Sequence, residues 1–67
     1  MKPYHIVIAH DQMGVMNEDG DSLACFSLDA GYAAAKRQIR KWSIEYAIYI
    51  GEAYATLDEH FTNATNK

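Results

Sequence analysis

The hydrophobic pattern of the first third of the chain is that of β-strands, since residues 4–10 are β-branched, aromatic or small apart from two histidines. Along this strand, one face is predicted to hold Tyr4, Ile6, Ile8 and His10, and the other face His5, Val7 and Ala9. Residues 13–16 continue or bend this strand, residues 17–21 gather turn formers, and residues 23–26 form the returning strand. The pattern predicts one β-hairpin over the first 27 residues. Its tip is acidic and is offered for partner binding through Glu18, Asp19 and Asp21.

The next segment has the spacing of an amphipathic helix that begins after Ser27 and ends near residue 42 or 43. Leu28, Ala35 and Ile39 share one arc of this helix with other apolar and small residues. The opposite arc holds four of the six basic residues and is predicted to be solvent-exposed. This basic helix face consists of Lys36, Arg37, Arg40 and Lys41.

Residues 46–50 alternate again and predict a third strand, which continues to residue 57 past a possible bulge at Gly51. Residues 58–67 have few apolar side chains and are expected to be a frayed or irregular tail. The whole chain, residues 1–67, is therefore expected to form a single small α+β domain.

The element order strand, strand, helix, strand implies a right-handed crossover and a three-stranded antiparallel sheet in the order 2-1-3. One helix can cover only one face of this sheet, and Ile6, Ile8, Ile48 and Ile50 are expected to point toward it. The other face is predicted to stay open and unusually apolar. Its members are His5, Val7, Ala9, Ala47 and Tyr49, and we assign partner binding to Val7, Tyr49 and Tyr54.

The composition restricts the possible classes of protein. A chain of 67 residues, 49% hydrophobic and 22% charged, is globular and has no room for an interdomain cleft. Its single cysteine, Cys25, excludes an intrachain disulfide, so oligomerisation or a partner is expected to supplement the small core. No targeting or membrane segment is apparent, and we expect a cytoplasmic location.

Candidate catalytic and metal-binding groups do not form a known constellation. His5, His10, His60 and Cys25 lack zinc-finger spacing, and nothing in the sequence brings a histidine to the cysteine. The run at residues 17–21 resembles the start of a calcium loop, but Ser22 and Leu28 stand where such a loop needs glycine and glutamate. We predict no enzyme activity, no metal and no cofactor.

The succession of an opening hairpin (HIVIAHDQ to SLACFS), an alanine-rich helix (SLDAGYAAAKRQI) and a tyrosine-rich segment (YAIYIGEAYATL) resembles small accessory proteins encoded by phages. Anti-CRISPR inhibitors are similar in size and build. The resemblance implies a stoichiometric inhibitor that blocks a host defence protein, such as a CRISPR-Cas component, or another host protein by surface contact. It rests on the pattern of elements and assigns no residue a role.

Two other functions remain open at this point. The open sheet face could be the interface of a homodimeric structural or antitoxin-like regulatory module. Alternatively, the basic helix face could bind nucleic acid, although the net charge of −3 argues against a general nucleic-acid binder. We expect a protein partner if the chain is an inhibitor or a homodimeric module.

Overall fold

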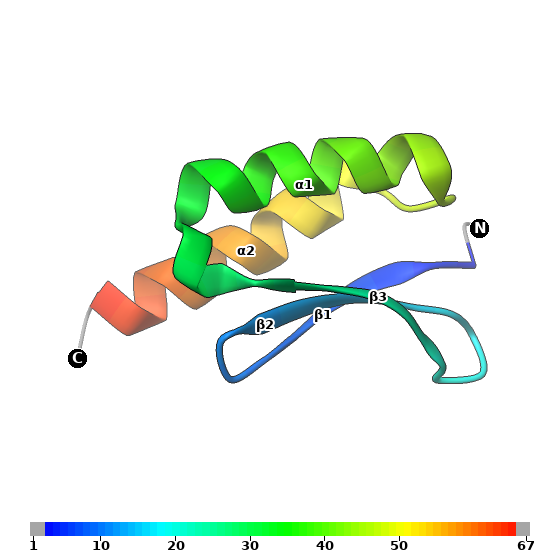
Figure 1. Ribbon diagram of the computed structural model, residues 1–67, viewed down its shortest axis with the longest axis horizontal. Helices are drawn as coiled ribbons and strands as arrows, with labels where there is room; N and C mark the ends of the chain where they lie inside the picture. Colours follow the sequence, from blue (N-terminus) through cyan, green and yellow to red (C-terminus); the bar gives the residue numbers. More distant parts are fainter. Residues whose placement is uncertain (1–2, 66–67) are drawn as a thin grey trace.

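Three short strands open the chain and two helices close it (Figure 1). The computed structural model describes residues 3–65. The α+β class is confirmed, whereas the single helix of the prediction is wrong. The elements are β1 (His5–Ala9), β2 (Gln12–Met16), β3 (Ser22–Ser27), the short 3-10 helix η1 (Leu28–Ala30), α1 (Tyr32–Glu45) and α2 (Ile50–Thr65).

The strands form an antiparallel meander in the order β1-β2-β3, joined by two hairpins. The prediction of one hairpin over the first 27 residues is therefore wrong, because residues 12–16 are a strand of their own. The first hairpin turns through His10 and Asp11 alone, since Ala9 pairs with Gln12. His10 has a φ of 58°, in the left-handed region that non-glycine residues seldom adopt. No glycine marks this turn, so sequence patterns give little sign of it.

The second hairpin contains the acidic tip and is organised by Asn17. The side-chain oxygen of Asn17 accepts the backbone N–H groups of Asp19 and Asp21 at 3.0 and 2.9 Å. Gly20, with a φ of 85°, donates its own N–H to the Asn17 carbonyl. This local bonding is typical of an Asx turn and fixes the loop through hydrogen bonds within residues 17–21.

The one predicted helix is present, with an interruption near its start. The Ser27 hydroxyl accepts the N–H of Asp29 and so caps η1, as its place before an acidic residue indicates. Gly31 follows with a φ of 100°, and α1 begins only at Tyr32. The chain thus turns at Gly31 between a short 3-10 segment and the long helix.

The strand predicted over residues 46–57 is a helix instead. Residues 46–49 connect the two helices, and α2 then continues to Thr65. The predicted irregular tail is likewise wrong up to Thr65, and residues 66 and 67 lie outside the described part of the chain. Ala53, Leu57 and Phe61 recur every fourth residue and face the core along one side of α2.

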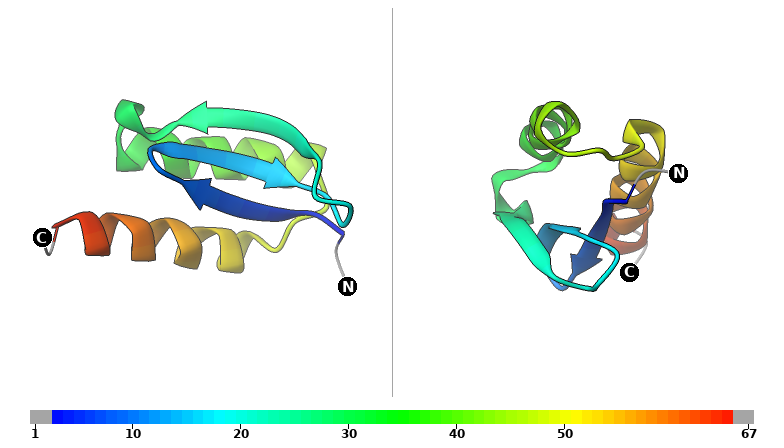
Figure 2. Two further views of the ribbon diagram at one scale, coloured as in Figure 1. Left: turned by 90° about the horizontal axis from the view of Figure 1, so that it is seen from below. Right: turned by 90° about the vertical axis from the view of Figure 1, so that its right-hand side faces the viewer.

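This replacement changes the topology of the sheet. Without a third crossover strand, the predicted order 2-1-3 fails and β1 is an edge strand rather than the central one. Both helices lie on the same side of the sheet, with α2 beside β1 (Figure 2). The short connection between the helices makes them antiparallel neighbours.

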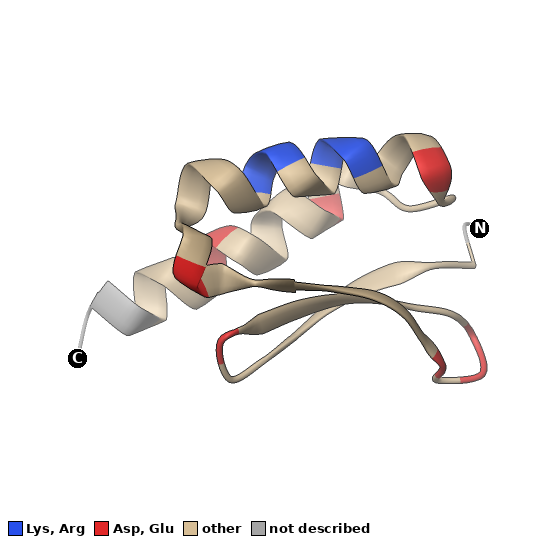
Figure 3. Ribbon diagram, in the orientation of Figure 1, with Lys and Arg blue, Asp and Glu red and all other residues tan. Residues whose placement is uncertain are grey.

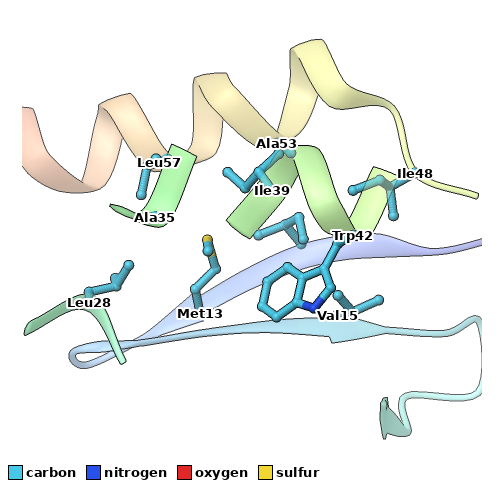
Figure 4. Close-up of a cluster of buried hydrophobic side chains, with 10 residues drawn as sticks. Met13, Val15, Leu28, Ala35, Ile39, Trp42, Ile48, Ala53 and Leu57 are labelled. Atoms are coloured by element: carbon cyan, nitrogen blue, oxygen red, sulfur yellow. The ribbon is translucent and has the colours of Figure 1, made fainter. Parts of the chain in front are cut away.

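The core lies between this sheet face and the two helices (Figure 4). Met13 and Val15 of the central strand meet Ile39 of α1 and Leu57 of α2, and all four are fully buried. Ile48 is buried in the connection between the helices, as the sequence predicts for an inward residue. Ile50, predicted to point inward, is instead exposed at the start of α2. Where the structure describes burial, residues 3–63, the buried residues are Ile6, Met13, Val15, Leu28, Ala35, Ile39, Trp42, Ile48, Ala53 and Leu57.

Candidate interaction surfaces

The outer face of the sheet, opposite the helices, is uncovered and mostly apolar. Its middle row is Val7, Gly14 and Cys25, which are opposite one another on β1, β2 and β3. A shallow depression of about 420 Å³ lies over this row because Gly14 has no side chain to fill it. Its other lining residues are Ala9, His10, Gln12, Met13, Met16 and Ser22, so no Lys, Arg, Asp or Glu lines it.

Cys25 lies on this outer face with its thiol exposed to solvent. Cys25 is therefore not a core residue, although its neighbours Ala24 and Phe26 pack against the core. Its sulfur is 3.5 Å from the Ser22 hydroxyl, which shares the same face because the register shifts between Val15 and Met16. Gly14 is tightly placed, since a methyl group there would come 3.3 Å from the Ala24 carbonyl oxygen.

The basic helix face divides into two parts. Arg37, Arg40 and Lys41 are exposed, in agreement with the helical pattern. Figure 3 shows in blue where Lys and Arg occur along α1. Lys36 is only half-exposed, because its ammonium lies 5.4 Å from the ring centre of Tyr32 and 5.3 Å from that of Tyr54. Lys36 therefore belongs to the contact between the helices, which the arc of the helix alone does not reveal.

The exposed part of this helix also includes an apolar side chain. Ile44 is 87% exposed, the highest value among the large hydrophobic side chains of the described residues. Arg37, Lys41 and Ile44 lie four and three residues apart and therefore share one stripe of α1. The acidic tip is likewise exposed at Glu18, Asp19 and Asp21, as predicted.

Two of the three residues assigned to the open sheet face are not on the sheet. Val7 is on the outer face as predicted and is 39% exposed. Tyr54 is a half-buried residue of α2 that packs against the core, and Tyr49 is an exposed residue of the connection just before α2. Ala47 lies in the same connection. All three errors follow from taking residues 46–57 as a strand.

Tyr32 connects the start of α1 to the second half of α2. Its hydroxyl donates a hydrogen bond to the Asp58 carboxylate, and its ring packs edge-on against Phe61 with 5.4 Å between the centroids. The hydrogen bond to Asp58 raises the pKa of Tyr32 above its usual value, because it favours the protonated phenol, and desolvation and the carboxylate charge act in the same direction.

A groove between β1 and α2 is the surface that the sequence does not predict. Its first part, about 300 Å³, is lined by Tyr4 and Ile6 on the sheet side and by Glu52, Thr56 and Glu59 on the helix side. A second hollow of about 240 Å³ continues it past Ile8 and shares Thr56 and Glu59. We call this surface the β1–α2 groove. In the sequence, the groove is indicated only by the spacing of residues 52, 56 and 59, which places them on one face of a helix. That signal can be used only when the segment is known to be helical.

Of the groups with possible metal or catalytic chemistry, His10 and Cys25 line the same depression, while His5 and His60 lie elsewhere. Among residues 3–65, no three side chains of His, Cys, Asp or Glu come together as metal ligands. His5 lines the first part of the β1–α2 groove, His60 packs edge-on against Phe61, and His10 and Cys25 both line the outer-face depression. Neither helix within the described part of the chain is long and apolar enough to cross a membrane.

Comparison with known proteins adds no assignment to this geometry: no family model, no curated protein and no solved structure matches the chain.

Proposed function

We propose that this protein is a non-enzymatic protein-binding module that contacts its partner with the outer face of its sheet. The observation that carries the proposal is the placement of both helices on the same face, which leaves Val7, Met16 and Cys25 without a covering layer. Antiparallel sheets with one wet face normally carry polar side chains there. An apolar face with this exposure is typical of an interaction surface.

The chemistry of the outer face suits a protein surface better than a charged ligand. The depression over Gly14 has an apolar centre formed by Val7 and Cys25, and its border includes the polar groups of Gln12 and Ser22. Protein interfaces are commonly built with such a centre and rim, with charges depleted at the centre. The mode we propose is stoichiometric occlusion of a host protein, as in the phage inhibitors that the chain resembles in its pattern of elements.

A second candidate is a homodimer through the same face. The lack of charged residues around the depression favours it, because a two-fold interface pairs the same patch of both subunits, and a patch charged with one sign would repel its copy. Size-exclusion chromatography with light scattering separates the two candidates. A dimer that Val7→Glu converts to a monomer would favour self-association, and a monomer would leave the face for a foreign partner.

The test of the proposal compares two variants of equal charge change. Immobilised wild-type protein and the Val7→Glu and Ala33→Glu variants are exposed to the same bacterial lysate; Ala33 is an exposed position of α1, on the other side of the molecule. We expect a protein retained by the wild type and Ala33→Glu but lost with Val7→Glu. Binding of that protein should also slow the reaction of the Cys25 thiol with a maleimide.

Equal retention by all three proteins would exclude the outer face as the binding surface. Retention that disappears at high salt and in the Arg37→Gln and Arg40→Gln variants would instead assign binding to the basic residues of α1. Nucleic acid in the retained material would then identify the partner as a nucleic acid.

A further inference from the structure

The β1–α2 groove lies where a fourth strand of the sheet would be. β1 is an edge strand, and within the described residues no strand pairs with it on the side away from β2. Seen from the side of the strands, α2 runs along β1 just beyond this free edge (Figure 2, left). The hollows lined by Ile6, Ile8 and Thr56 follow the edge along its length.

The backbone of β1 presents hydrogen-bonding groups to this groove. Tyr4 donates its N–H to the carbonyl oxygen of Ala47 at 3.2 Å, so the backbone at Tyr4 points away from β2. Backbone groups alternate in direction along an antiparallel edge strand, which gives Ile6 and Ile8 the same outward direction as Tyr4. The Tyr4–Ala47 bond thus begins a ladder that no strand within residues 3–65 continues, and an edge of this kind is a template for another strand.

The helix side of the groove leaves room for a main chain. Ala55, a small and exposed residue, lines the groove midway between Glu52 and Glu59. A larger side chain at this position would fill the space between α2 and the edge of β1. The hydrophobic surface of Tyr4 and Ile6 forms the floor.

The carboxylates of Glu52 and Glu59 line the groove, and no Lys or Arg does. Two histidines, His5 and His60, complete its ionisable groups, and with both neutral the groove carries only negative charge. Seven residues of helix place these two glutamates about 10 Å apart along α2. Alternate residues of an extended peptide lie about 7 Å apart and share a face, so the flexible side chains of two lysines can reach the two carboxylates.

We propose that the β1–α2 groove binds an extended, lysine- or arginine-containing segment of a partner protein, which pairs with β1 as a fourth strand. The backbone of Ile6 and Ile8 supplies the hydrogen bonds, and Glu52 and Glu59 select a basic sequence. A second copy of this chain is a poor occupant, because its own strands and hairpins, residues 5–27, contain no Lys or Arg. The proposal does not depend on the outer face of the sheet, which is a different surface.

The experiment uses a fluorescent hexapeptide, Lys-Val-Lys-Val-Lys-Val with blocked ends, titrated with the whole protein in an anisotropy assay. Two control peptides separate the contributions of charge and of backbone. One replaces each lysine with glutamate, and the other keeps the sequence but carries N-methyl groups on its valines or, in a second synthesis, on its lysines. We expect the basic peptide to bind, the acidic peptide not to bind, and one of the N-methylated peptides to lose most of its affinity.

Matched variants assign this binding to the groove. Ala55→Arg should abolish binding by filling the groove and placing a positive charge between Glu52 and Glu59, while Ala33→Arg makes the same change on an exposed part of α1 and should leave binding intact. Glu52→Gln together with Glu59→Gln should weaken binding by about tenfold or more, because charge-assisted hydrogen bonds are lost. Glu18→Gln together with Asp19→Asn in the acidic tip is the control for the same loss of two charges.

A measurement on the unmodified protein covers the case in which a groove variant does not fold. In heteronuclear NMR spectra, the basic peptide should shift the amide signals of Ile6 and Ile8 and slow their exchange with solvent. Peptide binding that is equal in Ala55→Arg and Ala33→Arg, that shifts α1 signals instead, or that is absent at millimolar peptide would overturn the proposal. Val7→Glu should not affect it, so this proposal and the proposed function can fail separately.

Discussion

The two faces of the sheet are formed by the same strands and differ in what lies against them. On the inner face, Met13 and Val15 are completely buried beneath α1 and α2. On the outer face, Val7 and Cys25 are exposed and Gly14 leaves a depression between them. Each strand therefore contributes alternate residues to stability and to a free surface.

This difference indicates how a chain of 67 residues can hold both a core and an apolar surface for binding. The inner face contributes to stability because its side chains are buried against two helices. The outer face stays exposed because both helices lie side by side in one layer on the other side of the sheet (Figure 2). A change on the inner face should therefore alter the free energy of unfolding, whereas a change on the outer face should alter binding alone.

The largest expected effect is at Met13. Met13→Ala should lower the free energy of unfolding by about 2–5 kcal/mol, because it removes a fully buried side chain and leaves a cavity. Cys25→Ala on the outer face should change it by only about 0.5 kcal/mol or less. Urea unfolding followed by circular dichroism gives both values. Equal losses would show that the outer face is packed against something in solution.

The next largest effect is a difference in stability between substitutions of the two serines that begin and end β3, Ser22 and Ser27. Ser27→Ala should cost about 1 kcal/mol, because the Ser27 hydroxyl caps η1 and joins the sheet to the helices. Ser22→Ala should cost less, since its hydroxyl contacts only the sulfur of exposed Cys25. Thermal unfolding of the two variants measures the difference. A greater loss at Ser22 would contradict the assignment of the cap.

Substitutions of Lys36 and Arg37 compare a basic residue of α1 that packs on α2 with one that is exposed. Lys36→Gln should destabilise the protein by about 0.5–1 kcal/mol, because the ammonium lies over the rings of Tyr32 and Tyr54. Arg37→Gln, one residue further and exposed, should be close to neutral. If the two variants had the same stability, Lys36 would belong with the exposed basic residues after all.

The smallest effect concerns Tyr32 and appears only in alkali. The raised pKa of Tyr32 means that the folded state holds the phenolic proton more tightly than the unfolded state, whose pKa is about 10. The resulting stabilisation is complete below pH ~10 and is lost as the pH rises through the folded-state pKa. The advantage of the wild type over Tyr32→Phe should therefore shrink above pH ~10 in thermal unfolding. An advantage that stays constant to pH ~12 would mean that the bond to Asp58 does not couple to titration.

The first half of the chain follows closely from its pattern. The alternation around Ile6 and Ile8, the turn at Asp19-Gly20 and the cap at Ser27 all appear in the structure where they were expected. The turn at His10 and Asp11 was missed, because histidine with a positive φ leaves no signature comparable to that of glycine. That omission merged two strands into one.

The second half shows why a short apolar run is ambiguous. Tyr46, Ile48 and Ile50 alternate like a strand, yet Ile48 is buried by the turn between two helices and Ile50 begins α2 exposed. The fourfold spacing of Ala53, Leu57 and Phe61 is the helical signal in the same region, and it competes with the alternation before it. Only packing against α1 and β1 decides between the two periods.

The sequence by itself determined the local elements that depend on neighbouring residues. These are the alternating faces of the first strands, the acidic tip held by Asn17, and the exposed basic residues of α1. Such features need only short-range bonding and helical or strand geometry, which sequence spacing records.

The tertiary structure alone decided the order of the strands, the covering of one face by two helices and the groove beside β1. These depend on contacts between residues far apart in the chain, such as Val15 with Ile39 and Leu57 in one core. Residues 50–65 form a helix that packs Ala53 and Leu57 into that core, and among the described residues no strand lies at the free edge of β1.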